Sequence, residues 1–173
     1  MPWGLSPLKC FVGGWSILNA TVTNTLTGDP IVAWHSVYPC GVSVYSESGY
    51  TSNIITANDT THRTVRPTEL ELPAHPTDDI PRWALVGQYS LATGGLFELV
   101  YDKDKHWGQP HFTGHIITTI TTSTLPSMVG RIENTEFEFF DDLCAGHVLR
   151  YAYGDTLQTI YYQRMPNHLR KTG

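Results

Sequence analysis

The sequence predicts an all-β protein, a single antiparallel β-barrel of about eight to ten strands with one short helix. Many short segments alternate β-branched or aromatic residues with small polar ones, which is the two-residue period of a half-buried strand. The 15 Gly and 11 Pro residues fit short strands joined by turns. Only one stretch has the features of a helix. An antiparallel sheet of this length generally closes, because closure removes its unpaired edges.

Length and charge narrow the class of protein. The 173 residues are enough for one domain with a substantial core, so we assign residues 1–173 to a single domain and the barrel to about residues 11–164. The formal net charge of −5 argues against a nucleic-acid partner, which usually needs a basic face. No stretch approaches the ~20 apolar residues of a membrane helix, and the first residues lack the pattern of a signal peptide. We therefore expect a soluble, cytoplasmic protein without nucleic-acid or membrane partners. The oligomeric state stays open, a homodimer included.

The three cysteines, Cys10, Cys40 and Cys144, are widely spaced and include no CxxC pair. This spacing matches neither a zinc signature nor a disulfide framework. In a cytoplasmic protein we expect three reduced thiols, and one disulfide with one free thiol is the alternative.

The first strand is predicted over residues 11–23, after a short arm at residues 1–9. A glycine pair precedes Trp15 and permits close backbone approach, so we expect the indole to plug one end of the barrel. With a period of two, one face of this strand holds Trp15, Ile17, Asn19 and Thr21.

A turn at residues 25–30 leads to a second strand at residues 31–37, which contains Trp34 and His35. Residues 41–55 form the clearest hairpin, with a turn at residues 46–49 where Gly49 can adopt a positive φ. One face of this hairpin is neither strongly apolar nor charged. Such a face is typical of the lining of a mixed cavity.

Residues 57–76 have little periodicity and form a long loop, a candidate lid over a cavity mouth. The helix is predicted over residues 77–87, with Thr77 as N-cap, two aspartates in the first turn and Pro81 after them. Its apolar residues are expected to cover one end of the sheet: Ile80, Trp83, Ala84 and Val86.

The second half of the chain continues the meander. A hairpin is predicted over residues 88–102 with its turn at Gly94 and Gly95, followed by an exposed charged turn at residues 102–110. The remaining strands are expected at residues 112–123, 131–140, 147–153 and 157–164.

Several motifs together resemble one family, the small lipocalin-like domain proteins of bacteria and fungi. The matching segments are Gly13-Gly14-Trp15, YPCGVSVYSESGYTS at residues 38–52, VGQY at 86–89, LPSMVG at 125–130 and TIYY at 159–162. The resemblance implies an antiparallel barrel around a central cavity. It also implies an association with natural-product tailoring, where related barrels act as cofactor-free cyclases, isomerases or pericyclases. The family supplies no universal catalytic motif, so candidate residues follow from the chemistry of this chain.

Four residues are the catalytic candidates: His115, Glu136, Arg131 and Tyr89. His115 lies mid-strand and would be a general acid or base near neutral pH if it faced the lumen; on the outer face it would bond to solvent. The strand at residues 131–140 has two mixed faces, one with Arg131 and Glu133, the other with Glu136 and Glu138, and its period does not show which is internal. A carboxyl group inside would have a raised pKa and could protonate a substrate. Arg131 inside, or a tyrosine, would polarise a carbonyl.

Tyrosine is abundant, and its ring with one polar tip suits a ligand cavity. For any single tyrosine, ordinary barrel packing is the alternative. The candidate ligand-binding residues are Trp15, Asn19, Trp34, His35, Tyr45, Tyr101, Tyr151 and Tyr161.

No motif for nucleotide, hydride or zinc-protease chemistry is present. His111 and His115, four apart on a strand, would lie ~13 Å from each other, too far to share one ion. We therefore expect no cofactor and no metal. The first hypothesis is a cofactor-independent cyclase or isomerase, a pericyclase included, acting on a hydrophobic polyketide- or terpenoid-like intermediate. The alternative is a non-catalytic carrier of a hydrophobic small molecule.

Overall fold

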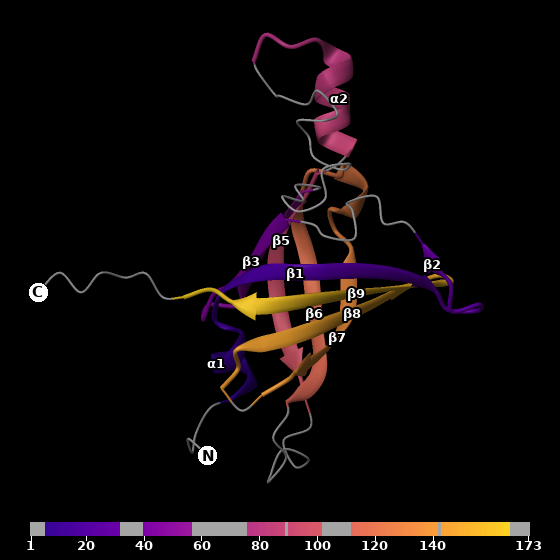
Figure 1. Cartoon of the computed structure of the whole chain (residues 1–173). Coiled ribbons are helices and arrows are strands. Elements are labelled where there is room, and N and C mark those ends of the chain that lie inside the picture. Colours follow the sequence, from indigo (N-terminus) through magenta and orange to yellow (C-terminus); the bar gives the residue numbers. More distant parts are fainter. Residues whose placement is uncertain are drawn as a thin grey trace, which may run out of the picture.

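Eight antiparallel strands close into a barrel in the computed structural model of the chain, which describes residues 6–31, 40–56, 76–88, 90–101, 112–141 and 143–166 (Figure 1). The barrel strands are β1 (Gly13–Asn24), β3 (Cys40–Tyr45), β4 (Tyr50–Thr56), β5 (Ser90–Val100), β6 (Thr113–Ser123), β7 (Ile132–Phe139), β8 (Gly146–Tyr153) and β9 (Thr156–Arg164). They follow one another around the barrel in chain order, and pairing of β1 with β9 closes it. The predicted all-β antiparallel barrel is confirmed.

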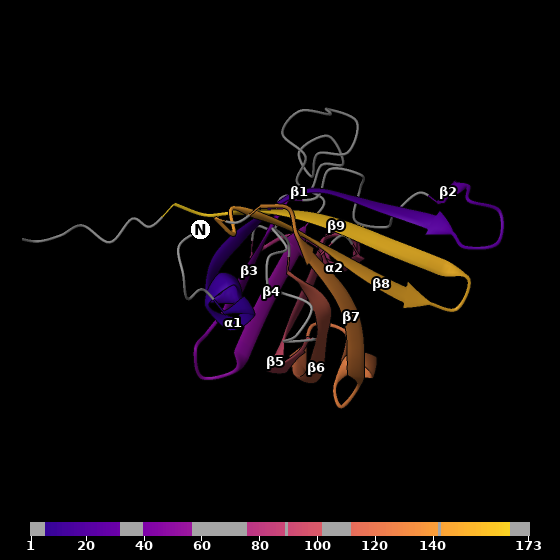
Figure 2. The ribbon, with the colours of Figure 1, turned by 90° about the horizontal axis from the view of Figure 1, so that it is seen from below.

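One side of the barrel extends into a longer sheet. The pairing of β1 with β9 continues to Asn24 and Thr156, and β2 (Pro30–Ile31) adds to the outer end of β1. Figure 2 shows β1, β8 and β9 running out beyond the other strands. The predicted second strand is described only as far as Ile31, so Trp34 and His35 lie outside the described residues.

Helix α1 (Pro7–Phe11) closes one end of the barrel, where the sequence predicted only an arm. The Ser6 hydroxyl caps it by accepting from the Lys9 amide, and Pro7 occupies its first turn. Trp15 is fully buried, and its indole Nε1 donates to the Phe11 carbonyl at 2.8 Å. The predicted role of Trp15 as a plug at the barrel end is confirmed.

A disulfide between Cys10 and Cys144 ties α1 to the turn between β7 and β8, and Cys40 is an exposed free thiol. The expectation of three reduced thiols is therefore wrong. The two cysteines are 134 residues apart, and only closure of the barrel brings them together. Disulfides persist mainly in oxidising compartments, so this bond weighs against the cytoplasmic location predicted above.

Arg164, the last residue of β9, fastens the same end. Its guanidinium lies 4.4 Å from the centre of the Trp15 ring, within the range of a cation–π contact. It also donates to the carbonyls of Cys10, Val12 and Cys144. Helix α1, the β7–β8 turn and the end of β9 therefore form one connected unit.

Residues 90–100 form one strand, and the predicted hairpin turn at Gly94 and Gly95 is wrong. The pairing with β6 shifts register between these glycines, which marks a bulge inside β5. A Cβ atom on Gly95 would collide with the Thr119 backbone carbonyl of β6. The glycine pair thus permits close approach of two strands.

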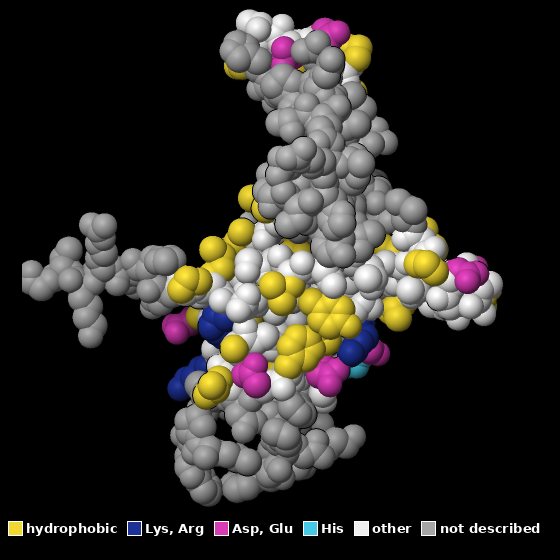
Figure 3. All heavy atoms as spheres, viewed as in Figure 1, with side chains coloured by type: hydrophobic (Ala, Val, Ile, Leu, Met, Phe, Trp, Pro, Cys, Tyr) yellow, Lys and Arg dark blue, Asp and Glu magenta, His cyan; other side chains and the backbone are white. Residues whose placement is uncertain are grey.

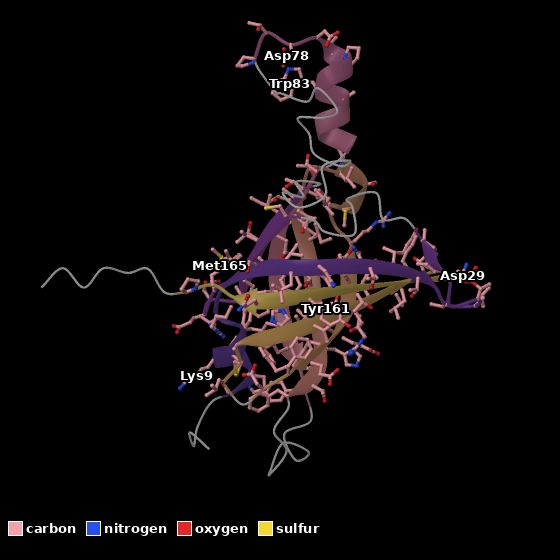
Figure 4. The ribbon with its side chains drawn as sticks, viewed as in Figure 1. Lys9, Asp29, Asp78, Trp83, Tyr161 and Met165 are labelled. Atoms are coloured by element: carbon pink, nitrogen blue, oxygen red, sulfur yellow. A yellow bond between two sulfur atoms is a disulfide. The ribbon has the colours of Figure 1, made fainter. Side chains whose placement is uncertain are left out.

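Helix α2 (Ile80–Gln88) starts three residues later than predicted and stands away from the barrel (Figure 1). Ile80 and Trp83 are 84% and 42% exposed, and Ala84 is exposed as well. The prediction that these side chains cover the sheet is therefore wrong. Figure 4 shows Trp83 beside the turn that holds Asp78. The Val86 side chain, the candidate lid at residues 57–75 and the turn at 102–111 lie outside the described residues.

The half of the barrel nearest α1 is packed solid with aromatic rings. Phe11 packs edge-on against Phe137 and Phe139 with ring centroids 4.8 Å away in both cases, and His147 lies among them. Figure 2, viewed from below, shows α1 at this end. Among the residues that the structure describes, space for a ligand therefore lies in the other half of the lumen.

Candidate functional site

A cavity of about 160 Å³ occupies that other half of the lumen and is partly open to solvent. Strands β3 to β9 line it together with Met128 of the 3₁₀ turn η3 (Pro126–Met128). Most of the wall is apolar, contributed by Ile55, Ile116, Ile120, Leu149 and Ile160. A cavity of about 150 Å³ in another protein holds one benzene ring. This cavity therefore accommodates about one ring, and a larger ligand would extend through the opening.

Strand β7 contributes the most reactive group. Its inward side chains are Glu133 and Thr135 at the cavity, followed by Phe137 and Phe139 in the packed core. This settles which face of the strand is internal. Among the described lining residues, Glu133 is the only charged one.

Glu133 lies beside Tyr151 of β8, whose phenol is close enough to the carboxyl group to influence its pKa. Burial raises the pKa of Glu133, while Tyr151 and the nearby Arg131 guanidinium lower it by smaller amounts. The pKa of Tyr151 is also raised, first by burial and then by the charge of Glu133. The site therefore combines a carboxyl group with a raised pKa and a neutral phenol.

Four hydroxyl groups gather at the inner end of the cavity. Tyr45, Thr51 and Tyr162 line it, and Ser43 is buried beside Tyr162. Burial raises the pKa of Tyr162 to about 12 and raises that of Tyr45 as well. Thr51 and Ser43 lie close enough to these phenols to lower their pKa values in part, but neither hydroxyl oxygen meets hydrogen-bond geometry.

His115, the first catalytic candidate, lies on the outer face of β6. The inward side chains of that strand are Ile116, Thr118 and Ile120, so His115 points outward. Its Nδ1 forms a hydrogen bond with the Asn134 side chain at 3.0 Å. Glu136 pairs with His115 across β6 and β7 and is exposed on the same outer face.

Arg131 is the catalytic candidate nearest the cavity. It is exposed beside Glu133, and its Nε donates to the Ser127 carbonyl at 2.9 Å. Tyr89 lies outside the described residues. Of the three catalytic candidates that the structure describes, Arg131 alone lies close to the carboxyl group of the cavity.

The ligand-binding candidates divide into two groups. Tyr45 and Tyr151 line the cavity. Trp15 is in the closed end, and Tyr101 packs partly buried against the aromatic core.

Asn19 and Tyr161 pair across β1 and β9, and neither lines the cavity. A bulge between Ile17 and Asn19 breaks the alternation that placed Asn19 on the Trp15 face. The Tyr161 ring stacks on exposed Phe140 at 6.0 Å. Figures 3 and 4 show Tyr161 in the region of an apolar patch on the outer surface over β8 and β9.

Two residues of the site carry most of its chemistry but were not selected from the sequence. The sequence identified Glu133 only as one of three glutamates on a strand with two mixed faces. Its even spacing to Phe137 and Phe139 places it on the same face as two large apolar rings, which could have identified that face as internal. Thr51 belongs to a polar hairpin face that gave no sign of which hydroxyl would be buried.

No group of three or more His, Cys, Asp or Glu side chains within the described ranges is placed to hold a metal ion. None of the helices described is long and apolar enough to cross a membrane. Neither a known protein-family model nor a curated protein matches the sequence. What is established is a closed antiparallel barrel with a lumen cavity, which agrees with a lipocalin-like fold.

Proposed function

We propose that the cavity binds a small hydrophobic molecule and that the chain is a cofactor-independent isomerase or cyclase, with Glu133 as its proton donor. The observation that supports this most directly is a carboxyl group with a raised pKa, beside the Tyr151 phenol, in an otherwise uncharged and largely apolar cavity. Such an environment favours general acid catalysis, because the acid is protonated nearer to neutral pH.

The proposed step consumes no co-reactant. Protonated Glu133 donates its proton to a carbonyl oxygen or an alkene carbon of the substrate. After the bonds of this cation have rearranged, the Glu133 carboxylate takes a proton from the rearranged cation, which yields the neutral product and restores the carboxylic acid. Tyr151 stabilises the carboxylate in between, because its phenol lies close enough to favour the charged form. The cavity walls contribute by restricting the substrate to a reactive shape.

Two observations indicate the class of substrate: the volume of the cavity and the resemblance of the sequence to a family. The cavity volume of about 160 Å³ fits about one ring of a larger molecule. The motifs listed above resemble lipocalin-like domain proteins, and membership in that family would place the substrate among polyketide- or terpenoid-like intermediates.

A non-catalytic carrier is the second candidate. The observation in its favour is the apolar wall, since burial of a hydrophobic ligand against Ile116, Ile120 and Leu149 needs no reactive group. In a carrier, Glu133 and Tyr151 would only orient the ligand.

Purified protein distinguishes the two. The gene for this chain is deleted in the organism that encodes it, and a metabolite extract of the deletion strain is prepared. The extract is incubated with purified wild type, Glu133→Gln or Glu136→Gln, and the products are followed by chiral chromatography. We expect wild type to convert one intermediate, Glu133→Gln to lose about 10²-fold or more of the rate, and Glu136→Gln, on the outer face, to match wild type. Conversion by Glu133→Gln at the wild-type rate would exclude the proposed acid. Retention of a metabolite without conversion would establish the carrier.

A further inference from the structure

Two hydroxyl groups deep in the barrel lie near phenols but meet hydrogen-bond geometry with no partner. Thr51 is 5% exposed and Ser43 0% exposed, and the oxygen of each is buried without a bond that meets hydrogen-bond geometry. Buried polar groups in proteins are nearly always bonded, so each exception calls for an explanation. The explanation we infer is a bound ligand: Thr51 lines the cavity, so a polar atom of the ligand can bond to its hydroxyl.

The neighbours of these hydroxyls define what such an atom must be. Thr51 of β4 lies directly opposite Tyr45 of β3, and Ser43 lies on the same face of β3 beside Tyr162. Both phenols are neutral at physiological pH, and burial disfavours their charged form further by raising their pKa values. The only charged residue among those described around the cavity is Glu133, on β7. A ligand anion at this end would meet no cation, whereas a neutral oxygen would meet hydroxyls able to donate and accept.

We propose that three hydroxyl groups lining the inner end of the cavity (Tyr45, Thr51 and Tyr162), with Ser43 buried beside Tyr162, bind a neutral oxygen function of the ligand, a hydroxyl or carbonyl. The proposal rests on the proposed function and narrows its substrate class. The substrate carries a ring with a neutral oxygen that docks at Thr51, and its reacting part lies at Glu133.

Three one-ring probes test this with the full chain: p-cresol with a neutral hydroxyl, toluene without oxygen, and p-toluate with a carboxylate. Their dissociation constants are measured by NMR titration for wild type, Thr51→Val, Thr51→Ser and Thr118→Val. Thr118 lines the same cavity from β6 and is the matched control. In wild type we expect p-cresol to bind best and p-toluate worst. In Thr51→Val the preference for p-cresol over toluene should fall about tenfold, while Thr51→Ser and Thr118→Val should keep it.

Valine has nearly the shape of threonine, and the Thr51 oxygen loses no internal bond. The unfolding midpoint of Thr51→Val should therefore equal or exceed that of wild type. If Thr51→Val does not fold, Thr51→Ser still tests whether a hydroxyl at this position maintains the preference for p-cresol. The subsite is overturned by an unchanged p-cresol preference in Thr51→Val, by strongest binding of p-toluate, or by absence of probe binding. The two proposals can fail separately. The probe titration tests the subsite, whereas the proposed function is tested by the loss of conversion in Glu133→Gln.

Discussion

His147 is a buried histidine with neither ring nitrogen hydrogen-bonded. Its ring stacks on Tyr162 with centroids 4.9 Å apart and lies edge-on to Trp15 at 4.3 Å. Burial, and secondarily the positive charge of Arg164, lowers its pKa to about 3. The folded protein therefore keeps this imidazole neutral, and His147 serves as an aromatic packing group.

This lowered pKa predicts acid sensitivity. Below about pH 6.5 the unfolded chain binds a proton at His147 that the folded chain does not, so the free energy of unfolding falls as pH drops from about 6.5 toward about 3. The slope from this residue is about 1.4 kcal/mol per pH unit. His147→Phe should reduce that slope, as measured by urea unfolding at several pH values. The outer-face control His115→Gln should retain it, and an unchanged slope in His147→Phe would contradict the assignment.

Tyr151 adjusts the acidity of Glu133. Its phenol, close to the carboxyl group, lowers the pKa of Glu133 against the larger effect of burial. Tyr151→Phe should therefore raise that pKa further and move the basic limb of the activity–pH profile to higher pH. The control is Tyr153→Phe, which is exposed on the same strand. A limb that stays in place would mean that Glu133 is not the titrating acid.

At the scale of elements, local patterns predicted what local chemistry determines. The hairpin of β3 and β4 was predicted because its alternation and its turn at Gly49 are both short-range features, and Gly49 has a φ of 82°. Strand β5 was divided wrongly because a glycine pair is equally typical of a turn and of a bulge. The β7 faces were unresolved because inward and outward sides both carry glutamate.

A substitution at Gly95 tests the close approach of β5 to β6. Gly95→Ala should lower the free energy of unfolding by about 2 kcal/mol or more, because its Cβ meets the Thr119 carbonyl and one of the strands must move. Gly87→Ala is the control, since a Cβ there meets nothing within 4 Å and alanine favours a helix. Thermal unfolding of both variants gives the comparison, and equal midpoints would contradict the close packing at Gly95.

For the whole molecule, closure was predictable and its long-range consequences were not. A meander of this many strands has a strong reason to close, and β1 and β9 pair to complete the barrel. The meeting of Cys10 with Cys144, and of Arg164 with Trp15, depends on contacts between the two ends of the chain. No local pattern reports such contacts.

The disulfide should contribute strongly to stability because it closes a long loop of the unfolded chain. The double variant Cys10→Ser, Cys144→Ser should lose about 2–5 kcal/mol of unfolding free energy. Cys40→Ser should change it by less than about 0.5 kcal/mol, because Cys40 is exposed and unpaired. Thiol labelling of the unfolded, unreduced protein should find one reactive cysteine. Three reactive cysteines would contradict the bond.

The central claim is that the lumen carboxyl group, and no outer-face residue, performs the function. The most direct test uses the organism that encodes this chain. Its metabolites are compared between a strain in which the chain is deleted and strains in which it is restored as wild type, Glu133→Gln or Glu136→Gln. We predict that an unrearranged or uncyclised intermediate accumulates in the deletion and in Glu133→Gln, and that wild type and Glu136→Gln restore the product. Full restoration by Glu133→Gln, at matched protein levels, would contradict the account.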